Sequence, residues 1–264
     1  MLDYKVLFLD IDGTIIRPDK SIEPSTKASI AAAMQKGIEV ILTTGRPIHE
    51  IEGLAQDLNV NSFIGYNGAS AILNGKEIFK LPIHPEHVEK LLTLASIHHH
   101  EVVLHTNKVN YLSHLESIKT QQFINLFEYK RNVPFHPEYI KSKEILGGAV
   151  INARMVEASL YEEIGSIYLS QTNSEGMHHC FDIMRSNVNK GTGVNKVLNQ
   201  LGILREQAIA FGDGLNDKEM LMNVEESFAM GNSHPDLFSY AKYKTTDVLH
   251  SGLYNGLKMI GIVD

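Results

Sequence analysis

The sequence has little of what marks several large protein classes. It holds one cysteine, Cys180, among 264 residues, so an internal disulfide is excluded and nothing indicates an oxidising compartment. The net charge of −7 leaves no basic excess for general nucleic-acid binding. No apolar run approaches the roughly 20 residues of a membrane span, and the N-terminus lacks a signal-peptide pattern. We therefore expect a cytoplasmic protein, a monomer or homodimer, that binds neither nucleic acid nor membrane.

Buried-strand and helical patterns alternate over the first part of the chain. Val6–Leu9 and Ile38–Thr43 are apolar without polar alternation, which is typical of strands buried on both faces. Helical patterns cover Ser25–Gln35 and Pro47–Leu58, and the same alternation resumes from Gly191. Strands that alternate with helices predict an α/β fold with a doubly wound, parallel, Rossmann-like sheet.

The middle of the chain differs in composition. Residues 83–187 are richer in His, Asn and Gln, and their strand patterns read as antiparallel pieces joined by hairpins. Helical runs are expected near 86–97, 115–129 and 153–164. We predict an inserted α+β cap domain over 83–187, with the Rossmann-like core formed by 1–82 and 188–264.

Carboxylates follow two of the buried strands. Asp10 and Asp12 end the first strand, and Asp213 ends the strand pattern in "AIAFGD". Burying two like charges costs several kcal/mol unless a cation lies between them. Parallel strands bring their carboxyl ends to one edge of the sheet, where an all-oxygen site suits Mg²⁺. The sequence therefore predicts a magnesium site there.

The same edge should carry donors for an anion. Thr44 and the amide of Gly45, which we place at a helix N-terminus, can donate to a phosphate, and Lys190 supplies a positive charge. An anion beside Mg²⁺ and facing an aspartate is the arrangement of phosphoryl transfer through an aspartyl-phosphate. Asp12 is near enough to Asp10 to give a proton to a leaving alcohol.

Four motifs in this set resemble those of the haloacid dehalogenase superfamily. They are "DIDGT", "TTGR", a lone lysine before a helix, and "GDGLND", and the large insertion is similar to that of the Cof-type, large-cap phosphatases. The resemblance implies the following roles: Asp10 as nucleophile; Asp12 as acid/base; Ile11, Thr44, Gly45, Lys190 and Asn216 as phosphate contacts; Asp10, Asp12 through its carbonyl, and Asp213 as Mg²⁺ ligands; and Asp217 as a carboxylate beside those ligands.

Other interpretations of the motifs are weaker. The "DIDG" stretch lacks the further ligands of a calcium loop, and in "GDGLND" Asp217 stands where a dinucleotide fingerprint needs its third glycine. The clusters His98–His100 and His178–Cys180 could suggest zinc, but adjacent strand residues point to opposite faces. We expect surface or loop positions for both clusters.

We accordingly predict a Mg²⁺-dependent phosphatase that hydrolyses small phosphorylated metabolites, sugar phosphates in particular. The alternatives are a phosphomutase of the same superfamily and a non-catalytic phosphometabolite sensor. A sensor needs no nucleophile, and a mutase would return the phosphoryl group to its substrate instead of releasing inorganic phosphate. Because the phosphate contacts bind only what all phosphate esters share, we expect the insertion to select the substrate.

Overall fold

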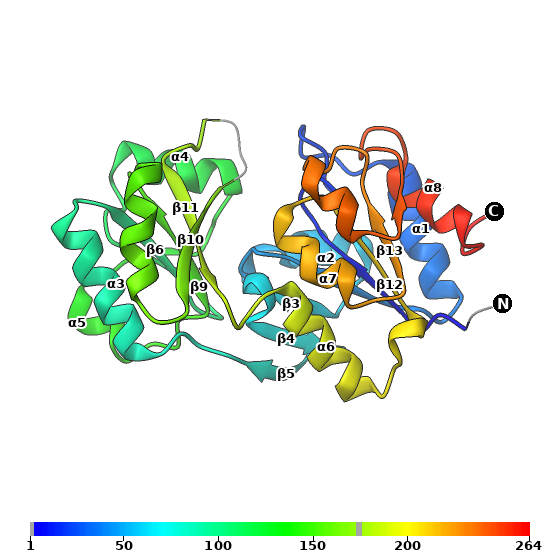
Figure 1. Ribbon diagram of the computed structural model, residues 1–264, viewed down its shortest axis with the longest axis horizontal. Helices are drawn as coiled ribbons and strands as arrows, with labels where there is room; N and C mark the ends of the chain where they lie inside the picture. Colours follow the sequence, from blue (N-terminus) through cyan, green and yellow to red (C-terminus); the bar gives the residue numbers. More distant parts are fainter. Residues whose placement is uncertain (1–2, 173–175) are drawn as a thin grey trace. The chain divides into compact units, whose positions relative to one another are not determined.

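The computed structural model of the protein describes residues 3–172 and 176–264, and the chain divides into two compact units (Figure 1). The first unit takes in the chain up to Gly45, Gly53–Phe79 and Asn189–Asp264. The second unit takes in Arg46–Glu52 and Lys80–Val188. Within the described residues the chain therefore leaves the first unit twice, once after Gly45 and once after Phe79. No helix in this part of the chain is long and apolar enough to cross a membrane.

The first unit is built on a largely parallel sheet of eight strands. Its strands, in spatial order, are β14 (Tyr243–Lys244), β13 (Glu226–Ala229), β12 (Ala208–Gly212), β1 (Val6–Leu9), β2 (Glu39–Thr43), β3 (Phe63–Gly65), β4 (Ser70–Leu73) and β5 (Lys76–Lys80). The strands from β14 to β3 are parallel, and β4 runs antiparallel to β3. The α/β fold with a doubly wound parallel sheet is therefore confirmed.

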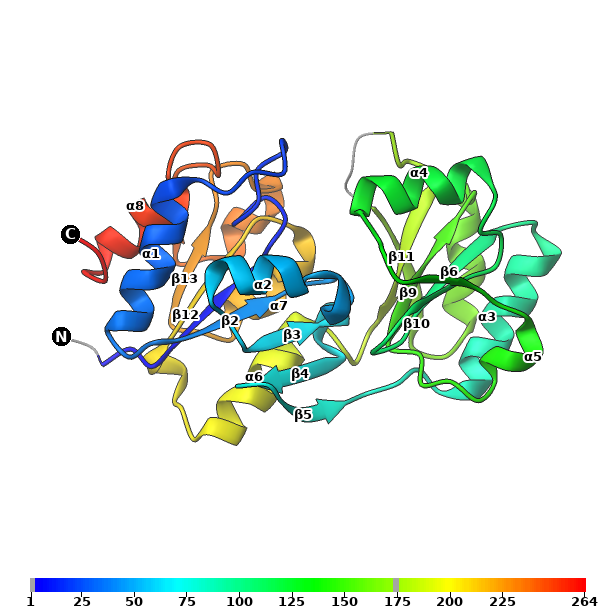
Figure 2. The same cartoon turned by 180° about the vertical axis from the view of Figure 1, so that it is seen from behind.

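Helices cover both faces of this sheet (Figures 1 and 2). They are α1 (Pro24–Gln35), α2 (Glu52–Leu58), α6 (Lys190–Leu201), α7 (Lys218–Met222) and α8 (Gly252–Met259). On one face Phe8 and Ala210 pack in a core with Val194 of α6 and Met220 of α7. On the other face a side chain at Gly256 of α8 would collide with the Phe211 ring, so α8 lies directly on the sheet. Strand residues therefore alternate between two covered faces, which explains the unbroken apolar runs.

The helical pattern over Pro47–Leu58 is not one helix. A single 3₁₀ turn, η1 (Ile48–Glu50), is followed by a break at Ile51, and α2 begins at Glu52. The η1 turn belongs to the second unit, and the described part of the first unit has four 3₁₀ segments of its own: η2 (Tyr66–Gly68), η4 (Arg205–Gln207), η5 (Leu215–Asp217) and η6 (Pro235–Tyr240). The apolar spacing predicted the buried face of this stretch but not the break.

The second unit has its own six-stranded sheet. In spatial order its strands are β10 (Ile167–Gln171), β11 (Cys180–Arg185), β9 (Gly147–Ile151), β6 (Glu101–His105), β7 (Asn110–Leu112) and β8 (Asn132–Pro134). Pairing is antiparallel except between β7 and β8, and the predicted hairpin of β6 and β7 is confirmed.

Two apolar cores lie on opposite faces of this second sheet. The helical segments are α3 (Pro85–Ile97), α4 (Ile118–Phe127), α5 (Pro137–Ile140) and the 3₁₀ segment η3 (Met155–Glu163). Leu91 of α3 packs in the core that includes Phe181, whereas Phe123 of α4 packs in the core that includes Cys180. The helix expected over 153–164 is thus a 3₁₀ segment, and the one expected over 115–129 is shorter.

Both clusters contain a residue that corrects the expectation of surface or loop positions. Cys180 of the second cluster is fully buried in β11. His100 is buried, and its ring nitrogens lie 2.8 Å from the Tyr161 hydroxyl and 3.2 Å from a Glu157 carboxylate oxygen. These contacts satisfy the ring within the second unit, so His100 is part of the packed structure.

Candidate active site

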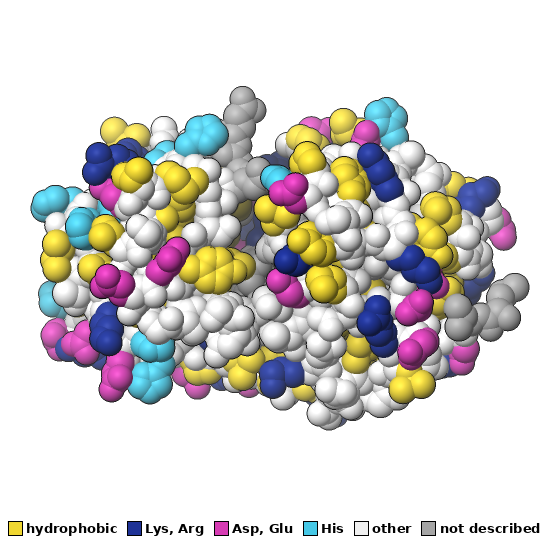
Figure 3. All heavy atoms as spheres, viewed as in Figure 1, with side chains coloured by type: hydrophobic (Ala, Val, Ile, Leu, Met, Phe, Trp, Pro, Cys, Tyr) yellow, Lys and Arg dark blue, Asp and Glu magenta, His cyan; other side chains and the backbone are white. Residues whose placement is uncertain are grey.

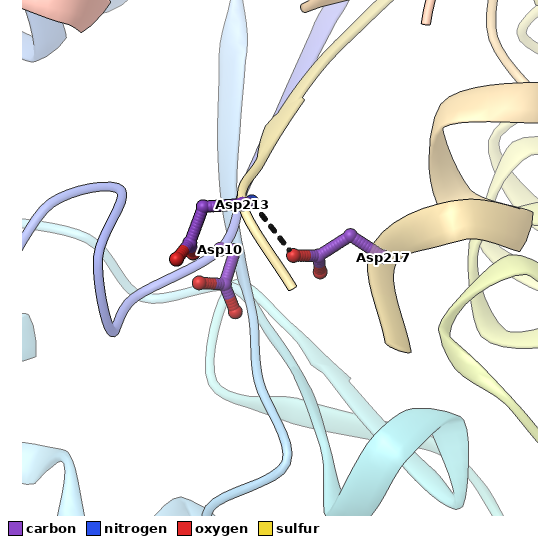
Figure 4. Close-up of side chains that lie close together, drawn as sticks. All are labelled: Asp10, Asp213 and Asp217. Carbon is purple, nitrogen blue, oxygen red and sulfur yellow. Dashed lines mark hydrogen bonds between the residues drawn. The ribbon is translucent and has the colours of Figure 1, made fainter. Parts of the chain in front are cut away.

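Three carboxylates of the first unit lie together at the carboxyl ends of the central strands. Asp10 follows β1, Asp213 follows β12, and Asp217 lies in η5 on the loop after β12. Because β1 and β12 are neighbouring parallel strands, Asp10 and Asp213 meet at the same edge. One carboxylate oxygen from each of the three lies within 4.8 Å of the others (Figure 4). We refer to Asp10, Asp213 and Asp217 as the carboxylate cluster.

Lys190 is buried against this cluster. It is the first residue of α6, whose start is capped by the Asn189 side chain, which accepts a hydrogen bond from the Thr192 amide. The Lys190 side chain is only 1% exposed, and its ammonium group donates to Asp10 and, at 2.6 Å, to Asp217 Oδ1. A surface lysine would not be held in this way, so the position agrees with the motif.

Both carboxylate oxygens of Asp217 accept hydrogen bonds from within the protein. While Oδ1 accepts from Lys190, Oδ2 accepts from the backbone amides of Asp213 and Gly214, each at 3.0 Å. A side chain at Gly212 would come within 2.6 Å of Asp217, so the strand end has room only for glycine there. Asp217 therefore orients Lys190 and the Asp213 loop, and its contacts leave Asp10 and Asp213 as the freer carboxylates.

Asp213 is also held from outside the cluster. The Thr14 hydroxyl donates to its Oδ1 at 3.3 Å, and the Asn232 side-chain amide donates to its Oδ2 at 3.3 Å. Asn232 also donates to the Gly13 carbonyl at 2.9 Å. Gly13 has φ of +84°, and a Cβ there would lie 2.2 Å from Asp213, so glycine is required on both counts.

The negative charge of the carboxylate cluster exceeds the positive charge of Lys190, and the pKa values of these groups are shifted. Burial and the neighbouring Asp217 charge raise the pKa of Asp10 to about 7, although Lys190 opposes the rise. Burial and the Asp10 charge raise the pKa of Asp213 well above its ordinary value. Burial alone would lower the pKa of Lys190, but Asp10 and Asp217 raise it above its ordinary value. With all three carboxylates ionised, the cluster and Lys190 together carry two net negative charges, which fits a hard divalent cation held by oxygen atoms.

The predicted phosphate contacts lie on neighbouring strand ends and loops of the first unit. Thr44 is buried after β2; its amide donates to the Ile64 carbonyl at 2.8 Å, and its carbonyl accepts from the Asn67 amide at 3.1 Å. The Asn216 side chain donates to Asn67 Oδ1 at 3.1 Å, and a Cβ at Gly45 would lie 3.1 Å from the Asn67 side chain. Ile11, between the two motif aspartates, is fully buried. Asn67 therefore joins the Thr44–Gly45 loop to Asn216.

One expectation about this loop is wrong. Thr44 and Gly45 do not stand at a helix N-terminus, since the chain stays irregular through Pro47 and then forms only the short η1 turn. Pro47 is extended, with φ of −59° and ψ of 132°, and has no amide to donate. Any anion bound here would be held by individual N–H and O–H groups, without the dipole of a full helix.

Asp12 lies apart from the carboxylate cluster. Its side chain is exposed, its backbone bridges to Ile16, and within the described residues the carboxylate grouping that could hold a metal comprises only Asp10, Asp213 and Asp217. An exposed carboxylate that still influences the pKa of Asp10 suits a group that exchanges protons with substrate or water. The backbone carbonyl of Asp12 remains a predicted ligand of Mg²⁺.

Asn67 and Asn232 belong to none of the four sequence motifs. Both follow strands of the same parallel sheet, Asn67 just after β3 and Asn232 just after β13. Polar residues that follow the carboxyl ends of parallel strands meet at one edge of the sheet. Applied to β3 and β13 as well as to β1, β2 and β12, this rule predicts Asn67 and Asn232.

Comparison with known proteins agrees with this arrangement. The family model for haloacid dehalogenase-like hydrolases matches residues 7–257. The chain is 28% identical to a protein of Bacillus subtilis (strain 168) named "Putative phosphatase YkrA", over 99% of this chain and 100% of that protein. It is 25% identical to 5-amino-6-(5-phospho-D-ribitylamino)uracil phosphatase YcsE of the same organism, over 97% of this chain and 96% of that protein.

A solved structure extends the likeness to three dimensions. A protein of Geobacillus kaustophilus HTA426 is 27% identical, with a TM-score of 0.88, and the match covers 98% of this chain and 100% of that one. The family model spans nearly the whole chain and covers most of the first unit and all of the second. The chain belongs to the haloacid dehalogenase-like hydrolases and is a phosphatase of their Cof type.

Proposed function

We propose that the protein is a Mg²⁺-dependent phosphatase that hydrolyses small phosphorylated metabolites, sugar phosphates in particular, through an aspartyl-phosphate on Asp10. The observation that carries this proposal is the Asp10 carboxylate at the end of β1, held by the buried Lys190 ammonium within the carboxylate cluster. A buried carboxylate that is only partly neutralised is a suitable nucleophile once a further cation is present.

Mg²⁺ would be held by Asp10, Asp213 and the backbone carbonyl of Asp12, and when bound it would neutralise charge on the phosphoryl oxygens. Asp217 would keep Lys190 and the Asp213 backbone in place, since its two oxygens already accept three hydrogen bonds. Lys190 alone does not balance the charge of the carboxylate cluster, which supports binding of a further cation by Asp10 and Asp213.

The reaction uses two carboxylates in turn. A carboxylate oxygen of Asp10 attacks phosphorus, the bond from phosphorus to the ester oxygen breaks, and Asp12 gives its proton to the leaving alcohol. Water then attacks the aspartyl-phosphate while Asp12 takes the water proton, which releases inorganic phosphate and restores the Asp10 carboxylate. The exposure of Asp12 supports this role, because its proton must be exchanged in each cycle.

Positioning of the phosphoryl group would fall to Ile11, Thr44, Gly45, Lys190 and Asn216. The contact between Asn216 and Asn67, which also packs on Gly45, supports a single phosphate pocket made of these residues. None of these groups distinguishes one leaving group from another.

We assign substrate selection to the predicted cap over 83–187, with 1–82 and 188–264 as the core. The relative YcsE is named for a phosphorylated ribityl compound, which supports a small phosphorylated metabolite as the substrate here. We place the enzyme in the cytoplasm, as a monomer or homodimer.

A substrate panel tests the proposal. Sugar phosphates, nucleotides, pyridoxal phosphate and p-nitrophenyl phosphate would each be incubated with the protein, and released inorganic phosphate measured. We expect release with Mg²⁺, none after exhaustive chelation with EDTA, and recovery when Mg²⁺ is restored. Full activity after chelation, or no release from any ester, would contradict the proposal.

A further inference from the structure

The loop that follows β13 is bound to the end of β12, beside the carboxylate cluster. We call residues 230–234, all within the first unit, the β13 loop. The Met230 amide donates to the Gly212 carbonyl at 3.0 Å, and the His234 amide donates to the Asp213 carbonyl at 3.0 Å. The two ends of the β13 loop therefore fix the backbone from which the Asp213 side chain projects.

Asn232, at the centre of the β13 loop, uses its whole side-chain amide group. Its Nδ2 group donates to the Gly13 carbonyl at 2.9 Å and to Asp213 Oδ2 at 3.3 Å, and its Oδ1 accepts from the Val248 amide at 2.9 Å. The Gly13 carbonyl cannot donate and the Val248 amide cannot accept, so an amide turned over by 180° would lose both bonds. One orientation of the Asn232 side chain is therefore strongly preferred.

The position of the β13 loop is fixed by a second chain segment of the first unit. The Gly231 amide donates to the Thr246 carbonyl at 3.0 Å, and a Cβ at Gly231 would lie 2.6 Å from the Asp247 backbone nitrogen. Backbones this close cannot shift toward each other. Asn232 is therefore placed by hydrogen bonds to three separate parts of the chain: the loop after β1, the end of β12 and the segment before α8.

We propose that Asn232 is a positioning residue that sets the affinity of the carboxylate cluster for Mg²⁺. One N–H orients the Asp213 carboxylate, and the other restrains Gly13, which directly follows the Asp12 carbonyl. A single side chain thus fixes two of the ligands in relation to each other. The inference rests on the proposed function, in which Asp213 and the Asp12 carbonyl hold Mg²⁺.

The donors to Asp213 leave room for the cation. The Thr14 hydroxyl donates to Oδ1 and Asn232 to Oδ2, each at 3.3 Å, while each oxygen of an ionised carboxylate has two acceptor positions. Hydrogen bonds of this kind orient a ligand without touching the metal, and losing one typically costs 10–100-fold in metal affinity.

The test uses two alanine variants of asparagines that hold the segment before α8. Asn232→Ala removes the donors to Asp213 and Gly13, and because Asn232 is exposed the variant should fold. Asn255→Ala is the matched control. The Asn255 side chain donates to Thr246 Oγ1 at 2.8 Å and to the His250 carbonyl at 3.1 Å, and it bonds neither Asp213 nor Gly13.

Mg²⁺ binding is measured by calorimetry and by thermal unfolding at increasing Mg²⁺, so the readout does not depend on turnover. Asn232→Ala should raise the Kd for Mg²⁺ by about tenfold, and Asn255→Ala should leave it within about twofold of wild type. Saturating Mg²⁺ should bring kcat for p-nitrophenyl phosphate in Asn232→Ala back to within about threefold of wild type. A merely structural role would lower the melting temperature in EDTA and leave the Kd unchanged.

Three results would overturn the inference alone: an unchanged Kd in Asn232→Ala, an equal rise of Kd in Asn255→Ala, or a loss of kcat that saturating Mg²⁺ does not restore. Wild-type protein that binds no Mg²⁺ would contradict the proposed function and this inference with it. The Mg²⁺ titration of wild type therefore distinguishes the two failures.

Discussion

Asp10 and Glu50 are both buried carboxylates, but the two units of the molecule treat them in opposite ways. In the first unit, burial and the charges of Asp217 and Asp12 raise the pKa of Asp10 to about 7 despite its contact with Lys190. In the second unit, the His49 ring and two backbone amides outweigh burial and lower the pKa of Glu50 to about 2. Burial alone therefore does not decide the state of a carboxylate; the groups facing it do.

The two pKa values distinguish a carboxylate whose charge is stabilised within the protein from a cluster whose charge is not. Glu50 accepts from the Asn110 side-chain amide and from the backbone amides of Lys130 and Arg131, so it needs nothing further, which is typical of an anchor. The carboxylate cluster has more negative charge than Lys190 can balance, which is typical of a site that receives a cation and reacts. On the face of the molecule drawn in Figure 3, acidic and basic side chains are interspersed, and no comparable concentration of carboxylates is seen.

The largest expected effect is on Asp10. Asp10→Asn keeps the shape of the side chain and removes the attacking charge, so kcat should fall at least about 10³-fold, roughly 4 kcal/mol of barrier. Steady-state release of phosphate from p-nitrophenyl phosphate measures it. Retention of more than a tenth of wild-type turnover would rule out Asp10 as the nucleophile.

The next effect is on cation binding at the cluster. With Mg²⁺ at about 100 times its Kd, the wild-type protein should gain about 2.7 kcal/mol against unfolding, whereas Asp213→Asn should lose most of that gain. Without Mg²⁺, Asp213→Asn should be at least as stable as wild type, because a repelled carboxylate has been removed. Thermal unfolding with and without Mg²⁺ measures both, and an equal Mg²⁺ response in the two proteins would contradict the account.

The smallest expected effect is the contribution of Glu50 to the pH dependence of the free energy of unfolding. Its folded pKa of about 2 lies below the ordinary 4.5, so its stabilisation is present above pH 4.5 and is lost as the pH falls toward 2. The free energy of unfolding of wild type should exceed that of Glu50→Gln by about 1–2 kcal/mol at pH 6, and the gap should narrow at pH 3. A gap that stays constant or widens on acidification would show that Glu50 is not held as an anion.

The parts of the fold that the sequence predicts are those with local signals. The β1 and β12 strands are apolar runs that end in aspartate, and the adjacency of parallel strands then brings Asp10 and Asp213 together. Lys190 is a candidate only in the company of the other strand-end residues and motifs, because nothing in its immediate neighbours predicts a side chain that is 1% exposed.

The Glu50 anchor has no comparable signal. Its partners are a side chain 60 residues away and two backbone amides about 80 residues away, and any residue other than proline could supply those amides. The apolar spacing of Ile48, Ile51, Leu54 and Leu58 instead favours one continuous helix. Long-range hydrogen bonds to Glu50 accompany the break at Ile51, and a local pattern does not contain them.

The most direct test of the central claim is to trap the phosphorylated aspartate. Wild-type protein with Mg²⁺ and an ester that it turns over would be quenched in acid during steady state and reduced with borohydride, which converts an aspartyl-phosphate to homoserine. Peptide mass spectrometry should find homoserine at position 10, and at no position in Asp10→Asn. Turnover without any homoserine at position 10, or homoserine at another aspartate, would contradict the account.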